Sequence, residues 1–174
     1  MCITEIGNIS LEQSTVFSQF KNLVHGFTTR KGGVSTGEYS SLSMSPWRGD
    51  DIENVRKNEK ILCESLSLQI KKLTATKQEH TDTVEIIDES RVGYGIEIPW
   101  NKGVDGCITT LKNVPLLCYS ADCVPILVYA SDIEAVVDLG LDLAGGHEQL
   151  GMHAAQALGY LGPDLGGGHF DAGI

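Results

Sequence analysis

The segment VPLLCYSADCVPILVYA, residues 114–130, decides the fold class of this chain. It holds two near-continuous apolar runs, and a third run, EAVVDLGL, follows at residues 134–141. Apolar runs of this kind are typical of strands that are buried on both faces. We predict that the three runs form the centre of a β-sheet, with the Cys123 thiol at the head of the second run.

Composition limits the class of protein and of partner. A chain of 174 residues can bury about 70% of the surface that its unfolded form exposes, so one domain is expected. The formal net charge is −10 and the isoelectric point is about 4.8. Since a nucleic-acid backbone requires a cationic face on its partner, we expect a small-molecule substrate and no nucleic acid.

The N-terminal residues carry no signal for export or membrane insertion. No basic segment precedes an apolar one there, and no long apolar run occurs further on. We therefore expect a cytoplasmic protein with no membrane partner. The five cysteines include no CxxC pair, so free thiols are expected rather than disulfides.

Local patterns predict further elements around these runs. Residues 50–68 predict a helix, with Asp50 or Asp51 as its cap and Glu53 in the first turn. A strand is expected to reach residues 78–80, so that His80 stands at a strand end, and a short helix is expected at 149–158.

Two groups of residues are candidates for chemistry. His80 and Cys123 could bind zinc or copper, and they could equally act as a base and a nucleophile. Arg30 stands beside Gly32 and Gly33 in a loop, a combination that suits an anion such as phosphate, although a surface loop without a ligand is as common.

These candidate residues lie in or near four sequence motifs: HGFTTRKGGVS (25–35), KQEHTDTVEIIDE (77–89), VDGCITT (104–110) and YSADCVPILVY (119–129). At this spacing they resemble the bacterial polyphenol-oxidase or laccase-domain family, also described as YfiH-type purine nucleoside phosphorylases. The likeness runs from His25 to about Val137, and LGPDLGGGHFDAG (161–173) is similar to a later segment of that family. The resemblance implies a single α+β domain over residues 1–174, with a mixed sheet flanked by helices and a shortened C-terminal part.

The resemblance also implies a metal site, which this chain matches incompletely. The histidine of the KQxH motif is His80 and the cysteine of the ADC motif is Cys123. The third ligand, the histidine of an HAGWRG motif, does not carry over, because Gly140 stands at its position. His147 is the nearest substitute and His153 a weaker one. Three explanations stay open: a rearranged site that uses His147, a site that a degenerate relative has lost, or a segment whose sequence has been altered.

Members of this family are similar in being zinc-dependent enzymes of purine nucleosides. The implied function is phosphorolysis of adenosine, inosine and methylthioadenosine, with deamination of adenosine, in which His80 and Cys123 are the catalytic positions. Copper-dependent oxidation of phenols is the alternative, although five histidines without an HxH pair make several copper sites hard to build. A relative that has lost its activity is the third hypothesis, and the oligomeric state is left open.

Overall fold

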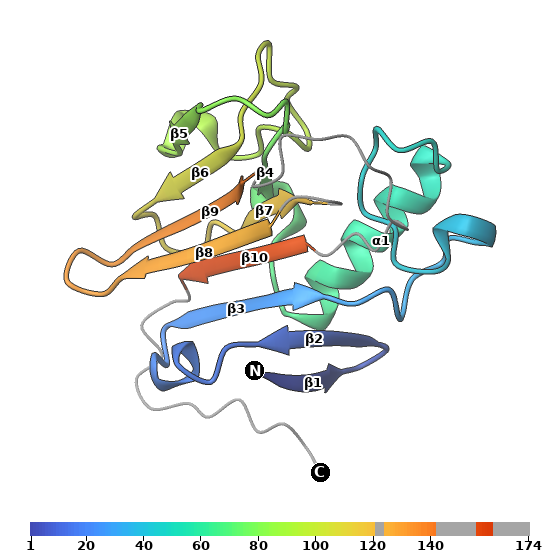
Figure 1. Cartoon of the computed structure of the whole chain (residues 1–174), viewed down its shortest axis with the longest axis horizontal. Helices are drawn as coiled ribbons and strands as arrows, with labels where there is room; N and C mark the ends of the chain where they lie inside the picture. Colours follow the sequence, from blue (N-terminus) through green and yellow to red (C-terminus); the bar gives the residue numbers. More distant parts are fainter. Residues whose placement is uncertain (121–123, 142–155, 162–174) are drawn as a thin grey trace.

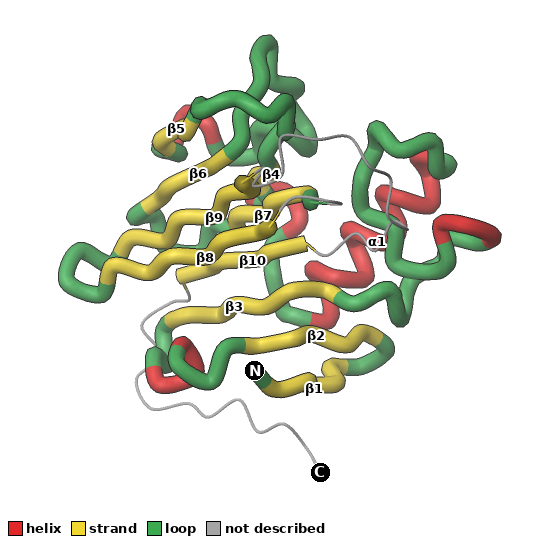
Figure 2. Tube along the Cα trace, in the orientation of Figure 1, coloured by secondary structure: helices red, strands yellow, loops and turns green. Residues whose placement is uncertain are grey.

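The computed structural model of the chain describes residues 1–120, 124–141 and 156–161. Strands predominate in this part and form two sheets (Figures 1 and 2). The six-stranded sheet has the order β1-β2-β3-β10-β7-β4, and the four-stranded sheet has the order β5-β6-β9-β8. Both are mixed, because β4 and β7 are parallel, as are β5 and β6, whereas the other pairs are antiparallel.

The six-stranded sheet contains β1 (Cys2–Ile6), β2 (Ile9–Gln13), β3 (Leu23–Thr28), β4 (Thr74–Ala75), β7 (Leu116–Tyr119) and β10 (Gln156–Leu161). The four-stranded sheet contains β5 (Val84–Ile86), β6 (Gly106–Thr109), β8 (Val124–Ala130) and β9 (Ala135–Leu141). The helices are α1 (Ile52–Ser65) and the short 3-10 turns η1 (Phe17–Gln19), η2 (Gly37–Tyr39), η3 (Ile70–Lys72) and η4 (Glu89–Arg91). No described helix has the length and apolar character needed to cross a membrane.

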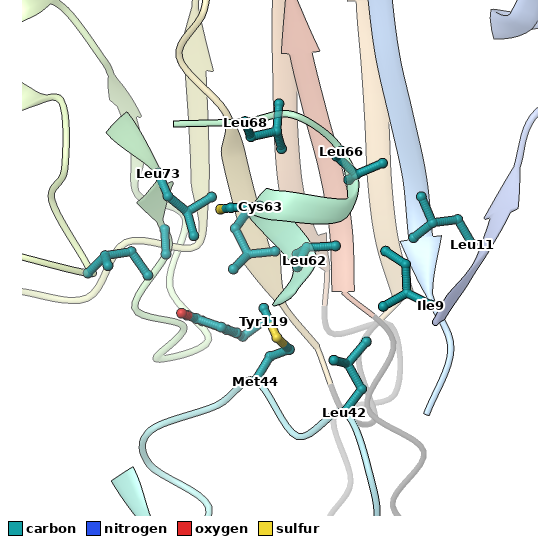
Figure 3. Close-up of a cluster of buried hydrophobic side chains, with 13 residues drawn as sticks. Ile9, Leu11, Leu42, Met44, Leu62, Cys63, Leu66, Leu68, Leu73 and Tyr119 are labelled. Atoms are coloured by element: carbon teal, nitrogen blue, oxygen red, sulfur yellow. The ribbon is translucent and has the colours of Figure 1, made fainter. Parts of the chain in front are cut away.

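The apolar core lies on both faces of the six-stranded sheet. Leu117 and Tyr119 of β7 belong to a cluster that includes Leu62 of α1 (Figure 3). Leu116, one residue earlier, packs with Val136 of β9 in the second cluster. Since successive side chains of a strand point to opposite faces, β7 contributes to both clusters. The molecule is therefore layered, with α1 on one face of this sheet and the smaller sheet on the other.

The predicted helix is confirmed as α1, and its cap is Asp51. The Asp51 carboxylate accepts a hydrogen bond from the Glu53 amide at 2.9 Å, which satisfies one of the free amides of the first turn. Asp50 has another role, because its carboxylate accepts a hydrogen bond from the Ser35 hydroxyl at 2.6 Å. The start of α1 is thus tied to the loop that precedes it.

The three apolar runs form strands as predicted, but they divide between the two sheets. β7 lies inside the larger sheet and β9 inside the smaller one. Among the described strands, β8 is at the edge of the smaller sheet. Val124 and Val128 of β8 are consequently 46% and 45% exposed. The prediction of a single central sheet was wrong for β8, because an apolar run identifies a strand and not its neighbours.

Two local predictions were also wrong. His80 does not stand at a strand end, since β4 stops at Ala75 and His80 lies in a turn with φ of 57°. The predicted helix at 149–158 overlaps β10, whose backbone pairs with both β3 and β7. Tertiary pairing decided the conformation there, and the remainder of that predicted helix lies outside the described residues.

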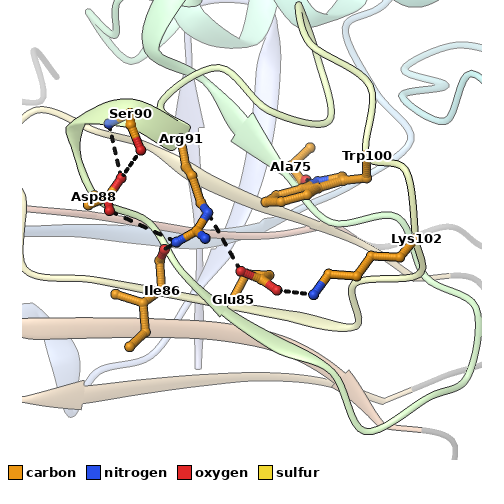
Figure 4. A network of polar contacts seen from close by, with 8 residues as sticks. All are labelled: Ala75, Glu85, Ile86, Asp88, Ser90, Arg91, Trp100 and Lys102. Carbon is orange, nitrogen blue, oxygen red and sulfur yellow. Dashed lines mark hydrogen bonds and ion pairs between the residues drawn. The ribbon is translucent and has the colours of Figure 1, made fainter.

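A polar network fastens the edge strand β5 to the loop that follows η4 (Figure 4). The Glu85 carboxylate pairs with the Lys102 ammonium at 2.5 Å and with Arg91 Nε at 3.7 Å. Arg91 also donates a hydrogen bond to the Ile86 carbonyl at 3.1 Å. Glu85 is largely buried, so this network holds the edge strand in place more firmly than an exposed ion pair would.

Candidate functional site

A pocket of about 320 Å³ opens where the loop after β3 meets the turn that carries His80. The end of β7 closes the third side. The lining residues are Arg30, Glu38, Tyr39, Ser40, Leu42, Ser43, Met44, Ser45, Trp47, Arg48, Lys77, Gln78, Glu79, His80, Tyr119 and Ser120. A volume of this size is at the lower end of the range for small-molecule sites.

The His80 turn is held by one buried carboxylate. Asp105, 5% exposed, accepts hydrogen bonds from the amides of Glu79 at 3.1 Å, His80 at 2.8 Å and Thr81 at 2.9 Å. It also accepts a short hydrogen bond from the Thr81 hydroxyl. The contact between Asp105 and His80 depends on a fold that brings together residues 25 positions apart along the chain.

The opposite wall is a loop anchored by the buried amide of Asn58 on α1. Asn58 is 0% exposed. Its Nδ2 donates to the Ser35 hydroxyl at 2.9 Å and to the Ser43 carbonyl at 2.6 Å, and its Oδ1 accepts from the Val34 amide at 2.8 Å. A fully bonded buried amide fixes its partners in one arrangement. The loop therefore presents its pocket-facing residues in a defined position.

The Arg30 side chain bonds to the backbone of the same loop. Its Nε donates to the Ser40 carbonyl at 3.0 Å, and its Nη2 donates to the Glu38 carbonyl at 3.0 Å. Arg30 lines the pocket, as the sequence suggested for a substrate contact, but two of its donors are occupied by the protein's own backbone. Its role in binding an anion stays a prediction.

Gly32 and Gly33 meet backbone atoms of the protein and are outside the pocket lining. A Cβ on Gly32 would lie 2.1 Å from the Asn8 carbonyl oxygen, and one on Gly33 would lie 2.1 Å from the Ser41 carbonyl oxygen. Gly32 also has a φ of 97°, which favours glycine. The structure thus gives both glycines a packing reason, and a part in substrate binding stays a prediction.

Two aromatic rings form the apolar wall of the pocket. The rings of Trp47 and Tyr119 meet edge to face, with centroids 5.4 Å apart and planes at 85°. Trp47 is 52% exposed and Tyr119 is 6% exposed. This arrangement leaves much of the indole accessible to a ligand while Tyr119 supports it from the core. The sequence analysis did not single out Trp47, although a tryptophan in a polar loop is a signal that could have been used.

Tyr119 is tied to a buried carboxylate on α1. The Tyr119 hydroxyl donates to Glu59 Oε1 at 3.4 Å, and Arg56 Nη1 donates to Glu59 Oε2 at 2.8 Å. Burial raises the pKa of Glu59, and the Arg56 guanidinium partly offsets that effect. Burial and the neighbouring Glu59 charge raise the pKa of Tyr119 well above its ordinary value, so the phenol is neutral. These contacts hold the ring in place rather than preparing it for proton transfer.

Of the predicted metal ligands, His80 lines the pocket, whereas Cys123, His147 and the weaker substitute His153 lie outside the described residues. Within the described ranges, no group of three or more His, Cys, Asp or Glu residues could hold a metal ion. The described part of the chain therefore does not by itself fit a metal centre.

Gly140, at the position of the expected histidine, lies next to the pocket residue Gln78. A Cβ on Gly140 would lie 2.1 Å from Gln78 Nε2 and 3.4 Å from Cys118 Sγ. Gln78 Nε2 is buried and has no hydrogen-bond partner among the described residues. The glutamine thus occupies space that a side chain at position 140 would need.

Asp138, two residues before Gly140 on β9, is a buried acid with little compensation from the described residues. It is 0% exposed, and neither carboxylate oxygen has a hydrogen bond of ordinary geometry from a described residue. Burial raises its pKa well above the ordinary value, and the Cys118 backbone amide lowers it by a smaller amount. Burial and the neighbouring Asp138 likewise raise the pKa of the Cys107 thiol, so Cys107 is a core thiol. No disulfide joins the four described cysteines, as expected.

The chain is similar in sequence to a family described as multi-copper polyphenol oxidoreductase laccase, whose model matches residues 24–139. A purine nucleoside phosphorylase of Bacteroides thetaiotaomicron is 35% identical over 114 residues, which make up 64% of this chain and 42% of that protein. Another, from Corynebacterium glutamicum, is 36% identical over 107 residues, or 61% of this chain and 42% of that protein. The chain therefore spans about two fifths of the length of these curated relatives.

Solved structures share the fold. YlmD from Geobacillus stearothermophilus matches with a TM-score of 0.70 and 28% identity, covering 80% of this chain and 51% of that one. A hypothetical protein YfiH of Bacillus licheniformis matches with a TM-score of 0.69 and 24% identity, covering 77% of this chain and 49% of that one. These likenesses confirm the α+β fold with mixed sheets. The region matched by the family model contains every residue that lines the pocket.

Proposed function

Because the chain belongs to the family described as multi-copper polyphenol oxidoreductase laccase, and its curated relatives are named purine nucleoside phosphorylases, we propose that it acts on purine nucleosides. The proposed reactions are phosphorolysis of adenosine, inosine and methylthioadenosine, and deamination of adenosine. The observation that carries the proposal is the half-exposed Trp47 indole in a pocket that also contains His80.

Trp47 suits a purine because a flat, electron-rich base stacks on an indole face. Such stacking contributes about 1–3 kcal/mol per base in nucleic-acid binding proteins. The buried ring of Tyr119 supports the indole from below, so the platform is rigid before a ligand arrives. A platform that is already ordered loses little entropy when the base binds.

His80 is the proposed catalytic residue of the described pocket. The Asp105 carboxylate accepts a hydrogen bond from the His80 backbone amide and so holds the turn from which the imidazole extends. A histidine imidazole can act as a general acid or base, and it can also bind a metal ion through a ring nitrogen. Both uses agree with the proposed reactions, in which the leaving group takes up a proton, the purine base in phosphorolysis and ammonia in deamination.

We propose zinc as the metal ion, with His80, Cys123 and His147 as its ligands and copper as the alternative. Such an ion would supply a bound water of lowered pKa. The described residues do not by themselves complete a centre for it. Cys123 is also the second proposed catalytic position, and Arg30, Gly32 and Gly33 remain proposed contacts of the phosphate or ribose.

Two other functions follow from specific observations. The family description itself favours copper-dependent oxidation of phenols. Gly140, at the position of the expected histidine and beside Gln78, favours a relative that has kept the fold and lost the activity. We place both behind the nucleoside reaction, because the aromatic platform and the pocket cations suit a nucleoside and a phosphate.

The test is turnover of adenosine, inosine and methylthioadenosine in the presence and absence of phosphate. Release of the free base that depends on phosphate supports phosphorolysis, and inosine formed from adenosine without phosphate supports deamination. Oxygen consumption with a phenol would support the copper alternative. No turnover of any of these by a folded protein would favour the inactive relative. We propose that the protein acts on these substrates in the cytoplasm.

A further inference from the structure

The cations of the pocket differ in how far the protein itself uses them. Three cationic side chains line it, namely Arg30, Arg48 and Lys77, against the two carboxylates of Glu38 and Glu79. This local balance is positive in a chain whose formal net charge is −10. An anion that approaches this acidic protein is therefore attracted to the pocket more than to the surface as a whole.

Two of the three cations already have partners. Lys77 Nζ lies 2.6 Å from Glu79 Oε1, so its charge is neutralised within the pocket. Arg30 donates to the carbonyls of Ser40 and Glu38. These contacts stabilise the pocket wall, and breaking them to bind a ligand would cost part of the energy gained.

Arg48 is different, since it makes no hydrogen bond or ion pair with any residue in the described ranges. Its guanidinium offers five donors in a planar fork, the geometry that matches the oxygens of a phosphate. We infer that Arg48 holds an oxyanion of the phosphate class in this pocket. Identifying the anion as a substrate rests on the proposed function.

The segment that carries Arg48 is held at both ends. Met44 is fully buried in the core, and Asp50 is bonded to Ser35. Between them, Gly49 has a φ of 93°, and a Cβ there would lie 2.9 Å from the Tyr39 hydroxyl oxygen. A side chain at this position would therefore be strained and crowded. The turn at Gly49 fixes where the chain goes after Arg48.

Arg48 follows Trp47 directly, and this adjacency links the two ligand contacts. The indole is the surface proposed for a purine base, and the guanidinium belongs to the next residue of the chain. One short segment could then bind both the flat ring and the anion of a nucleoside reaction.

The same chemistry fits two sources of the anion. Inorganic phosphate could bind beside a nucleoside as the second substrate of phosphorolysis. Alternatively, the phosphoryl group could belong to a nucleotide whose base lies on Trp47. Both place a doubly charged oxyanion against the Arg48 guanidinium, so the identity of the residue can be tested before the source is known.

The experiment measures binding of inorganic phosphate by ³¹P NMR and calorimetry to the wild-type protein and to Arg48→Gln. Arg30→Gln and Lys57→Gln are tested beside them. Lys57 is exposed on α1 outside the pocket, so its variant has the same change in net charge as Arg48→Gln. We expect phosphate affinity to fall about tenfold or more in Arg48→Gln and to stay unchanged in Lys57→Gln. Thermal unfolding should be the same in Arg48→Gln and wild type, because Arg48 has no described partner to lose.

The two sources are separated by comparing AMP with adenosine. If the anion belongs to a nucleotide, AMP binds more tightly than adenosine, and Arg48→Gln removes the difference. If it is inorganic phosphate, phosphate and adenosine bind together, and Arg48→Gln weakens only phosphate. Either result supports the inference.

Three results would overturn it: no phosphate or AMP phosphoryl binding by wild type, equal affinity in Arg48→Gln and wild type, or a loss in Arg30→Gln alone. Failure of the proposed function would appear separately. In that case no nucleoside is turned over, while phosphate binding still depends on Arg48.

Discussion

The Asp105 carboxylate accepts a hydrogen bond from the His80 amide at 2.8 Å and thereby fixes the backbone of the residue proposed to act in the pocket. The neighbouring amides of Glu79 and Thr81 bond to the same carboxylate. A turn in which His80 takes a φ of 57° is costly for a residue with a side chain. The buried acceptor stabilises this conformation, because it accepts hydrogen bonds from three successive amides of the turn.

Replacing Asp105 should therefore disturb the site and the stability together. Asp105→Ala is expected to lower the free energy of unfolding by about 2–4 kcal/mol, because several hydrogen bonds to a charged, buried acceptor are lost. Urea denaturation measures this change. Asp82→Asn is the control, since Asp82 is exposed in the same turn and should have an effect below about 0.5 kcal/mol. Similar unfolding curves for Asp105→Ala and wild type would contradict the assigned role.

Asp138 should make stability depend on pH. Its pKa is raised in the folded state, so the folded protein keeps a proton that the unfolded chain releases above its ordinary carboxyl pKa. The stability contribution is then complete below that ordinary pKa and decreases as the pH rises toward the folded pKa. Asp138→Asn removes this dependence, so relative to the variant the wild type should lose up to about 1.4 kcal/mol per pH unit within that window.

The measurement is urea denaturation of both proteins at several pH values between 5 and 8. Glu59 also has a raised pKa, but it is present in both proteins, so its effect cancels in the difference. The expected outcome is that the free energy of unfolding of Asp138→Asn increases relative to that of the wild type as the pH rises. Parallel pH profiles would show that Asp138 does not titrate differently in the folded state.

The sequence predicted the elements whose stability is local or strongly apolar. α1 was predicted because Asp51 caps it and its apolar residues follow a helical spacing. β7 and β9 were predicted because buried strands need long apolar runs. β10 was missed, since what makes residues 156–161 a strand is the pair of neighbours β3 and β7, which lie far away along the chain.

The site was predictable to a similar degree. His80 was proposed from its motif, and the structure puts it in the lining of the pocket, while its part in the chemistry stays a prediction. The function of Asp105 could not be inferred from the sequence, because its contact with the turn exists only after β6 has paired into the sheet. Trp47 and Arg48 were overlooked, since a loop has no periodicity from which a pocket-facing position can be inferred. The significance of Trp47 comes from Tyr119 at the end of β7, which supports the indole.

Trp47→Ala should weaken nucleoside binding with little effect on folding. The lost stacking predicts a rise in the Kd for adenosine of about tenfold, while the free energy of unfolding should change by less than about 1 kcal/mol because the indole is half exposed. Trp47→Phe should retain much of the affinity. Ile133→Ala is the control, since Ile133 is 62% exposed in the turn between β8 and β9. Unchanged adenosine binding in Trp47→Ala would exclude Trp47 as the platform.

Metal content by mass spectrometry tests the proposed ligands. Protein purified without added metal should contain zinc or copper near one equivalent, and the double variant His80→Ala, Cys123→Ala should lose it. His147→Ala should also lose most of the metal if His147 is the third ligand. Metal that persists in the double variant would place the site elsewhere, and none in the folded wild-type protein would favour the inactive relative.

Gly140→His tests whether a metal ligand can be supplied at the position where the resemblance implies a histidine. The nearest atom to a Cβ there, at 2.1 Å, is the far end of the Gln78 side chain, which can rotate away at modest cost. We therefore expect the variant to fold, with a loss of about 1–3 kcal/mol from crowding, and Gln78→Ala in the same chain should recover part of that loss. Zinc affinity should rise about tenfold or more if His80 and Cys123 already form part of a centre, because a third ligand lies on the same ion. Calorimetric zinc titrations of Gly140→His and of Gly140→Ala separate this effect from crowding alone, and equal zinc affinity in the two variants would mean that position 140 does not face the ion.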